Sequence, residues 1–114
     1  MRTSVVLFAL LLGPLLAFAQ SEPAPDASRS RELVRMVRQD CGSCHGMRLT
    51  GGLGPALTRE ALADFPLESL VAVIFHGRPG TPMPPWKAML SEPEARWIAV
   101  RLQQGFPEEV VKAP

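Results

Sequence analysis

Hydrophobic residues recur at helical spacing in three stretches of this chain. The first stretch comprises Leu33, Val37, Cys41 and Cys44. Their spacing of i, i+4, i+8 and i+11 places all four on one face of a helix. We expect this helix to run from about Ser30 to Asp40, or on into the cysteine pair.

The second stretch follows Pro66, a residue that is tolerated in the first turn of a helix. Its apolar positions are Leu67, Leu70, Val71, Ile74 and Phe75. Gly77 is a helix stop signal, so we expect the helix to end just before it. A shorter helix, capped by Thr58 and continuing to about Asp64, is predicted to precede this one.

The third stretch opens with a capping box, in which Ser91 is the cap and Glu94 the third helical residue. Its apolar positions are Ala95, Ile98, Ala99 and Leu102, and Gly105 ends it. The pattern therefore predicts an all-α fold of about four short helices. We expect the last helix to cross the first and to close the domain.

Two segments between the helices cannot be regular. Residues 46–57 contain Gly46, Gly51, Gly52, Gly54 and Pro55, and residues 78–86 contain four prolines in nine positions. Glycine and proline at such density predict loops, and the prolines stiffen the second loop.

The N-terminus has the features of a secretory signal. Arg2 precedes an apolar run from Val5 to Leu16, and Ala17-Phe18-Ala19 is an A-x-A cleavage site. We predict a signal peptide over residues 1–19 and export to the periplasm; an uncleaved anchor is the alternative. The run is shorter than the roughly 20 residues that span a bilayer, so no stable membrane insertion is expected after cleavage.

The rest of the chain is predicted to hold one small domain. Residues 20–29 are rich in Pro, Ala and Ser and predict a flexible lead-in, residues 30–105 the domain, and residues 106–114 a tail. Removal of Arg2 with the signal leaves eleven basic side chains against eleven acidic ones. This balance gives no basic stripe for nucleic acid. Arg31, Arg35 and Arg38 lie off the apolar face of the first helix, and we expect them to be solvated.

Cys41-Gly42-Ser43-Cys44-His45 is the stretch with the clearest chemistry. Cys-x-x-Cys-His is the attachment motif of c-type haem. At a spacing of three on a helix, the two thiols share a face and can form thioether bonds along one edge of a single porphyrin. His45 follows directly and can bind the iron as proximal ligand. We therefore predict one haem c attached through Cys41 and Cys44.

Three other interpretations of the motif remain open. A disulfide between Cys41 and Cys44 suits an exported protein. A thioredoxin-like redox motif needs a βαβ context, which the pattern does not provide. Zinc would take its four ligands from the cysteines, His45 and His76, but the adjacent Cys44 and His45 would strain a tetrahedral site.

Met83 is the candidate for the second axial ligand. It lies in the proline-rich loop, where a thioether is held firmly but is poorly placed for core packing. The other interpretation, core filler, fits Met36 and Met89 better. Met47 is too close to His45 to reach the opposite side of the iron.

Three further residues are candidates for haem contacts. The carbonyl of Pro55 is a candidate acceptor for the second ring N–H of the ligating His45, because such an acceptor fixes the ring. Arg78 and Trp86 carry N–H donors that can hold haem propionates. The alternatives are an ordinary turn for Pro55 and surface or packing roles for the other two, and His76 is expected to be a helix-end residue.

The order of these features resembles a class I cytochrome c. More narrowly, CGSCHGMRLTGGLGPAL, HGRPGTPMPPW and SEPEARWIA resemble the NirC-type small cytochromes c of denitrification gene clusters. The resemblance implies a periplasmic monohaem protein encoded with the nitrite reductase that carries haem c and haem d1. It further implies redox partners: electron transfer to that reductase, or a redox part in making its haem d1 with a maturation protein.

The residues and the resemblance together predict an electron carrier and not an enzyme. His45 and Met83 would occupy both axial positions and leave none for a substrate. Two alternatives remain. One is a haem-based sensor or small catalyst with an open axial position, and the other is a cofactor-free exported module with a Cys41–Cys44 disulfide.

Overall fold

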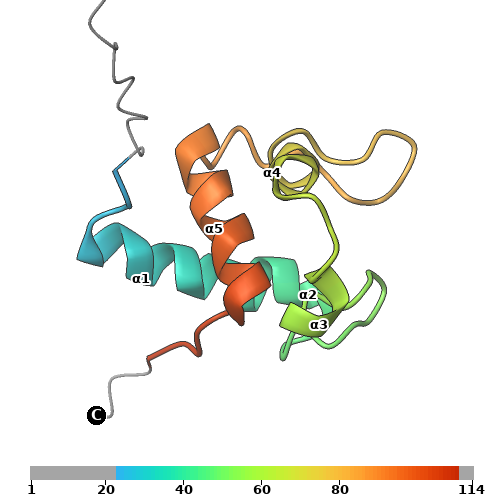
Figure 1. Cartoon of the computed structure of the whole chain (residues 1–114), viewed down its shortest axis with the longest axis horizontal. Coiled ribbons are helices and arrows are strands. Elements are labelled where there is room, and N and C mark those ends of the chain that lie inside the picture. Colours follow the sequence, from blue (N-terminus) through green and yellow to red (C-terminus); the bar gives the residue numbers. More distant parts are fainter. Residues whose placement is uncertain (1–22, 111–114) are drawn as a thin grey trace, which may run out of the picture.

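The computed structural model describes residues 23–110, and this part of the chain forms helices joined by loops, without strands (Figure 1). The predicted all-α fold is thereby confirmed. The predicted signal peptide, residues 1–19, lies outside the described residues, as do residues 20–22 and 111–114. Within residues 23–110, no helix is long and apolar enough to cross a membrane.

The first helical run carries the cysteine motif at its end. It consists of α1 (Ala27–Met36), a π-helical turn η1 (Val37–Cys41) and α2 (Gly42–His45). Asp26 caps the run by accepting a hydrogen bond of 2.8 Å from the Arg29 amide. The helix therefore begins at Ala27, three residues before the predicted start at Ser30, because an aspartate at this position satisfies a free N–H of the first turn.

The π-helical turn changes which side chains face the interior. A π-turn closes with an i→i+5 hydrogen bond and so rotates the following residues relative to an α-helix. Leu33 and Val37 are completely buried, Cys41 is partly buried, and Cys44 is exposed. The predicted apolar face thus ends at Cys41, and His45 takes the buried position beyond it.

The remaining helices begin and end where the local sequence dictates. The helix α3 (Arg59–Leu62) is capped by the Thr58 hydroxyl, and α4 (Leu67–His76) starts after Pro66 and ends at Gly77. The helix α3 stops two residues before the predicted Asp64. The helix α5 (Glu92–Gln104) has the predicted capping box of Ser91 and Glu94.

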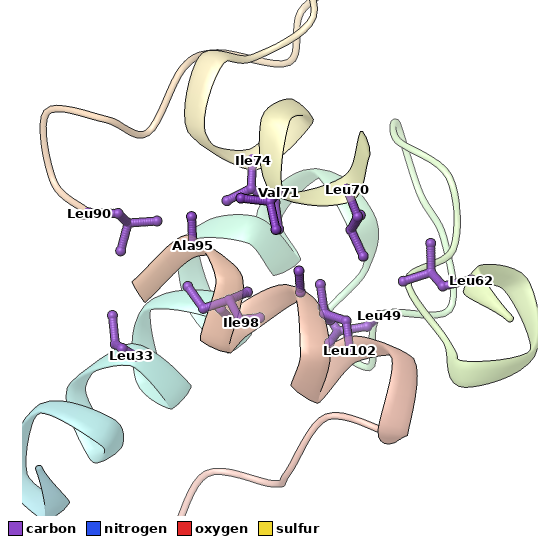
Figure 2. Close-up of a cluster of buried hydrophobic side chains, with 12 residues drawn as sticks. Leu33, Leu49, Leu62, Leu70, Val71, Ile74, Leu90, Ala95, Ile98 and Leu102 are labelled. Carbon is purple, nitrogen blue, oxygen red and sulfur yellow. The ribbon is translucent and has the colours of Figure 1, made fainter. Parts of the chain in front are cut away.

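The core lies where α5 packs against α4 and crosses the first helical run (Figures 1 and 2). Its members are aliphatic: Leu33, Val37, Leu49, Leu62, Leu70, Val71, Ile74, Leu90, Ala95, Ile98, Ala99 and Leu102. Each fully buried Leu or Ile contributes about 1.5–3 kcal/mol. The core thereby fixes the helices from which the two site loops, residues 46–57 and 78–90, emerge.

Two bidentate ion pairs connect α5 to its neighbours. Arg29 of α1 donates to the Glu94 carboxylate at 2.6 and 3.1 Å, and also to the carbonyl of Met89. Arg96 of α5 donates to Glu68 of α4 at 2.6 and 2.7 Å. Both acceptors lie in the first turn of a helix, where a negative charge also complements the helix dipole.

The C-terminal segment is fastened to the first helical run by Arg38. This guanidinium donates to the carbonyls of Phe106 and Pro107 at 2.7 and 2.9 Å, and Glu108 lies 3.4 Å away. Arg38 is only 7% exposed. The expectation that it is solvated is therefore wrong, because carbonyls from a segment about seventy residues away satisfy its donors. Arg31 and Arg35 are exposed, as predicted.

We predict that Glu94→Gln lowers the free energy of unfolding by about 1 kcal/mol at neutral pH. The hydrogen bond from Arg29 lowers the pKa of the Glu94 carboxyl. A lowered pKa stabilises the fold above the unfolded-state pKa, and this contribution disappears as pH falls through the folded-state pKa. Denaturant unfolding of the holoprotein should therefore show a gap between wild type and variant that is full above about pH 4.3, the ordinary glutamate pKa, and narrows at lower pH.

Glu92→Gln is the matched control for this prediction. Glu92 is exposed in the same helical turn and has no side-chain hydrogen bond to the described residues. Its substitution should change stability much less. Equal effects of the two substitutions at all pH values would contradict the role given to the Arg29–Glu94 pair.

Candidate haem-binding site

The two cysteines are free thiols in different surroundings. Cys41 lies at the end of η1 and packs against the core, whereas Cys44 in α2 is exposed. Burial raises the pKa of the Cys41 thiol to about 11, and the carboxylate of Asp40 adds to the shift. The Cys41 side chain is therefore a neutral thiol at neutral pH.

Neither the disulfide nor the zinc interpretation finds support in residues 23–110. Cys41 and Cys44 are not bonded to each other. No group of three or more His, Cys, Asp or Glu side chains within this range is arranged to hold a metal ion. His76, the predicted fourth zinc ligand, is exposed at the end of α4 and lies edge-on to Phe75, with ring centroids 4.9 Å apart.

His45 is buried, and a single hydrogen bond sets its orientation. Its Nδ1 lies 2.7 Å from the carbonyl oxygen of Pro55, and the residue is 9% exposed. A carbonyl can only accept a hydrogen bond, so Nδ1 carries the proton and donates. The lone pair then resides on Nε2, the atom that can bind a metal. The contact expected of Pro55 is therefore present.

The loop of residues 46–57 folds back over His45 because its glycines lack side chains. A Cβ on Gly54 would lie 2.8 Å from both Cε1 and Nδ1 of the imidazole. The Gly54 amide donates to the Cys44 carbonyl at 2.7 Å, and the Gly51 amide to the His45 carbonyl at 2.8 Å. The loop thus holds the ring by a hydrogen bond at Nδ1 and by close approach of the Gly54 backbone.

These residues fit a covalently attached haem. The donor set comprises two free thiols at the motif spacing and an imidazole with a free Nε2. The close approach of the Gly54 backbone limits movement of the imidazole. A ligating histidine normally has such a carbonyl acceptor on its second nitrogen.

The Met83 loop is anchored at the C-terminal end of α4. Its first turn closes with the Arg78 amide donating to the Met83 carbonyl at 3.1 Å. On its far side, the amides of Trp86 and Lys87 donate to the last carbonyls of α4 at 3.2 and 3.1 Å. The Met83 side chain is partly buried.

The structure places Arg78 and Trp86 on this same loop. Arg78 is exposed, and Trp86 is partly buried against the core. Neither the guanidinium nor the indole N–H has a hydrogen-bond partner among the described residues, so both keep donors for a ligand. A propionate contact for either residue stays a prediction.

Two glycines were not recognised in the sequence as site residues. The sequence pattern predicts a loop around Gly54 and a helix stop at Gly77, and it does not predict the backbone contact that each glycine makes. The Gly-Pro pair at residues 54 and 55 is the signal that identifies the first. No local sequence pattern identifies the contact of Gly77, because residues 83–85, which pack on it, are brought there by the path of the loop.

Fold and site together define a monohaem c-type cytochrome. A family model described as "Cytochrome C oxidase, cbb3-type, subunit III" matches residues 28–100, a range that includes the cysteine motif and both site loops. The match agrees with a covalent haem c bound through Cys41 and Cys44.

Individual relatives show to which family of c-type cytochromes the chain belongs. Cytochrome c55X from Stutzerimonas stutzeri is 51% identical over 107 residues, which cover 94% of this chain and 91% of the relative. A solved structure of the c-type cytochrome NirC is 60% identical, with a TM-score of 0.69, and the match covers 70% of this chain and 94% of that one. This chain belongs to the family of NirC-like class I cytochromes c that includes cytochrome c55X.

A third relative is much longer than this chain. Dihydro-heme d1 dehydrogenase from Pseudomonas aeruginosa is 36% identical over 104 residues. The match covers 90% of this chain but only 20% of that protein. That enzyme therefore contains a segment related to most of this chain within a larger polypeptide.

We predict that Gly54→Ala displaces the His45 imidazole. The added methyl group would overlap the ring, at a cost of about 1–3 kcal/mol. The spectrum of the holoprotein should gain a high-spin component, and the free energy of unfolding should fall. Leu53→Ala is the control, because this neighbouring side chain is 94% exposed; an unchanged spin state in Gly54→Ala would contradict the proposed contact.

Proposed function

We propose that this protein is a one-electron carrier in which His45 and Met83 are the two axial ligands of the haem iron. The single observation that carries the proposal is the hydrogen bond of 2.7 Å between His45 Nδ1 and the Pro55 carbonyl. It fixes both the tautomer and the orientation of the ring, and it leaves Nε2 free. A histidine that served only as packing would not need this arrangement beside two free thiols.

The two ligand loops suit a site that does not rearrange when an electron arrives. When bound, haem supplies an iron that alternates between the ferric and ferrous states, and a methionine ligand raises its potential. His45 is held by Pro55 and Gly54, and the Met83 backbone by the Arg78 amide. Because protein contacts hold both ligands, neither has to move during electron transfer.

Arg78 and Trp86 are proposed to bind the haem propionates. Their side-chain donors have no partner among residues 23–110, and both lie on the loop that presents Met83. An arginine forms charge-assisted hydrogen bonds to carboxylates. The cofactor-free alternative is not retained, because members of this family carry haem c covalently. The open-site sensor or catalyst remains the competing proposal.

Met83→Ala tests the ligand assignment and separates the two proposals. We expect the wild type to show a low-spin spectrum with the methionine-to-ferric-iron band at the red end of the visible range. The variant should lose this band and bind carbon monoxide rapidly when reduced, and Met89→Ala should retain the band. If Met83→Ala leaves the spectrum unchanged, or if the reduced wild type binds carbon monoxide rapidly, the site is not closed by Met83.

We further propose that the electron partner belongs to haem d1 maturation. A segment related to this cytochrome occurs within dihydro-heme d1 dehydrogenase, which indicates that a domain of this type works beside that chemistry. Removing two hydrogens from a dihydro-haem yields two electrons and two protons. Two oxidised cytochromes would each take one electron, and solvent the protons. The expected signal peptide would direct the chain to the periplasm for this role.

Exposed cations on the site loops offer a contact surface for such a partner. Arg48 and Lys87 are exposed, and neither makes an ion pair within residues 23–110. Neither residues 41–58 nor residues 77–90 contain an acidic residue. An acidic region on the partner would therefore be attracted to this side of the molecule, and the attraction would weaken with salt.

Stopped-flow kinetics test the partner. Oxidised cytochrome is mixed with dihydro-heme d1 dehydrogenase and its substrate, and we expect two cytochromes reduced per substrate oxidised. Lys87→Glu should slow the reaction and reduce its salt dependence, whereas Arg31→Glu, an equal charge change on α1, should not. A second experiment mixes reduced cytochrome with nitrite reductase. If electrons are transferred only in this second experiment, the maturation role is wrong and the protein delivers electrons to the reductase.

A further inference from the structure

Gly77 has a backbone conformation that other residues do not adopt. Its φ is 71° and its ψ is −173° at the end of α4, a region that is essentially restricted to glycine. The direction of the chain after this helix therefore depends on the absence of a side chain. A helix stop alone would need only a glycine in the left-handed helical region.

The space beside Gly77 is filled by the backbone that follows Met83. A Cβ on Gly77 would lie 2.7 Å from Pro84 C and Pro85 N, and 2.8 Å from the Met83 carbonyl oxygen. These are main-chain atoms of a proline-rich segment, so no side-chain rotation can relieve the overlap. Any larger residue at position 77 must push this segment away from the helix end.

Hydrogen bonds on both sides hold the segment in the same place. The Arg78 amide donates to the Met83 carbonyl, and the Trp86 and Lys87 amides donate to the final carbonyls of α4. The Thr81 hydroxyl donates to the Arg78 carbonyl at 2.7 Å and accepts from the Met83 amide at 3.3 Å. Arg78, Thr81 and Met83 are thus hydrogen-bonded to one another, and the residues that follow Pro85 are hydrogen-bonded to α4.

We propose that Gly77 is a positioning residue for Met83. Its missing side chain lets the backbone of residues 83–85 lie against the end of α4, and this packing places the Met83 side chain before any bond to iron forms. The inference rests on the proposed function in taking Met83 as the axial ligand. It goes further in stating what holds Met83 in place: the packing of the backbone, and not the bond between the Met83 sulfur and the iron.

A pair of glycine substitutions tests this role. Gly80 lies in the same loop and also has a positive φ, 76°, but a Cβ there would have nothing within 4 Å. Both Gly77→Ala and Gly80→Ala introduce backbone strain, and only the first also displaces the Met83 segment. We expect Gly77→Ala to lose the methionine-to-iron band, to lower the reduction potential and to bind carbon monoxide in the reduced state. Gly80→Ala should keep the band.

Hydrogen–deuterium exchange on Met83→Ala gives a second test that needs no change at Gly77. This variant removes the bond to iron and leaves the glycine in place. If the helix end positions the loop, the amides of Arg78, Trp86 and Lys87 should stay protected as in the wild type. Loss of their protection would show that the iron bond holds the loop, and would overturn the inference even if Gly77→Ala does not fold.

The outcomes separate this inference from the proposed function. A wild type without the methionine band would contradict the function itself. A wild type with the band, together with a folded Gly77→Ala that retains it, would contradict only the role of Gly77. Far-ultraviolet circular dichroism establishes that the variants compared are folded.

Discussion

The hydrogen bond from His45 to the Pro55 carbonyl is the constraint on which the site depends. It needs a loop that turns back sharply enough to bring residue 55 beside residue 45, and this requires backbone without side chains at the points of closest approach. The loop is in turn fixed by amide donors to the carbonyls of the cysteine helix. The motif and the loop are therefore one structural unit, although only the motif binds the porphyrin covalently.

At the Met83 loop, too, a segment is held in place by packing closely against a glycine. There the support is the end of α4, and the close approach is at Gly77. In both places a glycine contacts the segment that carries or orients a ligand, and proline limits its movement. The helical core supplies the two rigid supports, and its aliphatic side chains need no specific chemistry beyond packing.

The features that depend on neighbouring residues can be predicted from the sequence, whereas those that depend on distant contacts cannot. The capping box, the apolar stripe of α5 and the cysteine motif depend on neighbours within a few residues, so their patterns suffice. The burial of Arg38 depends on carbonyls at positions 106 and 107. Hydrophobic periodicity likewise does not encode the π-turn or the crowding at Gly77. The early start of α1 was readable from Asp26 as a cap.

The hydrogen bonds between Arg38 and the carbonyls of Phe106 and Pro107 have a consequence for how the chain folds. The contact joins residues 69 positions apart, and it can form only when nearly the whole polypeptide is available. Closing so long a segment costs chain entropy, and distant contacts slow folding. We therefore expect this contact to form after the local helices, whose hydrogen bonds join residues only a few positions apart.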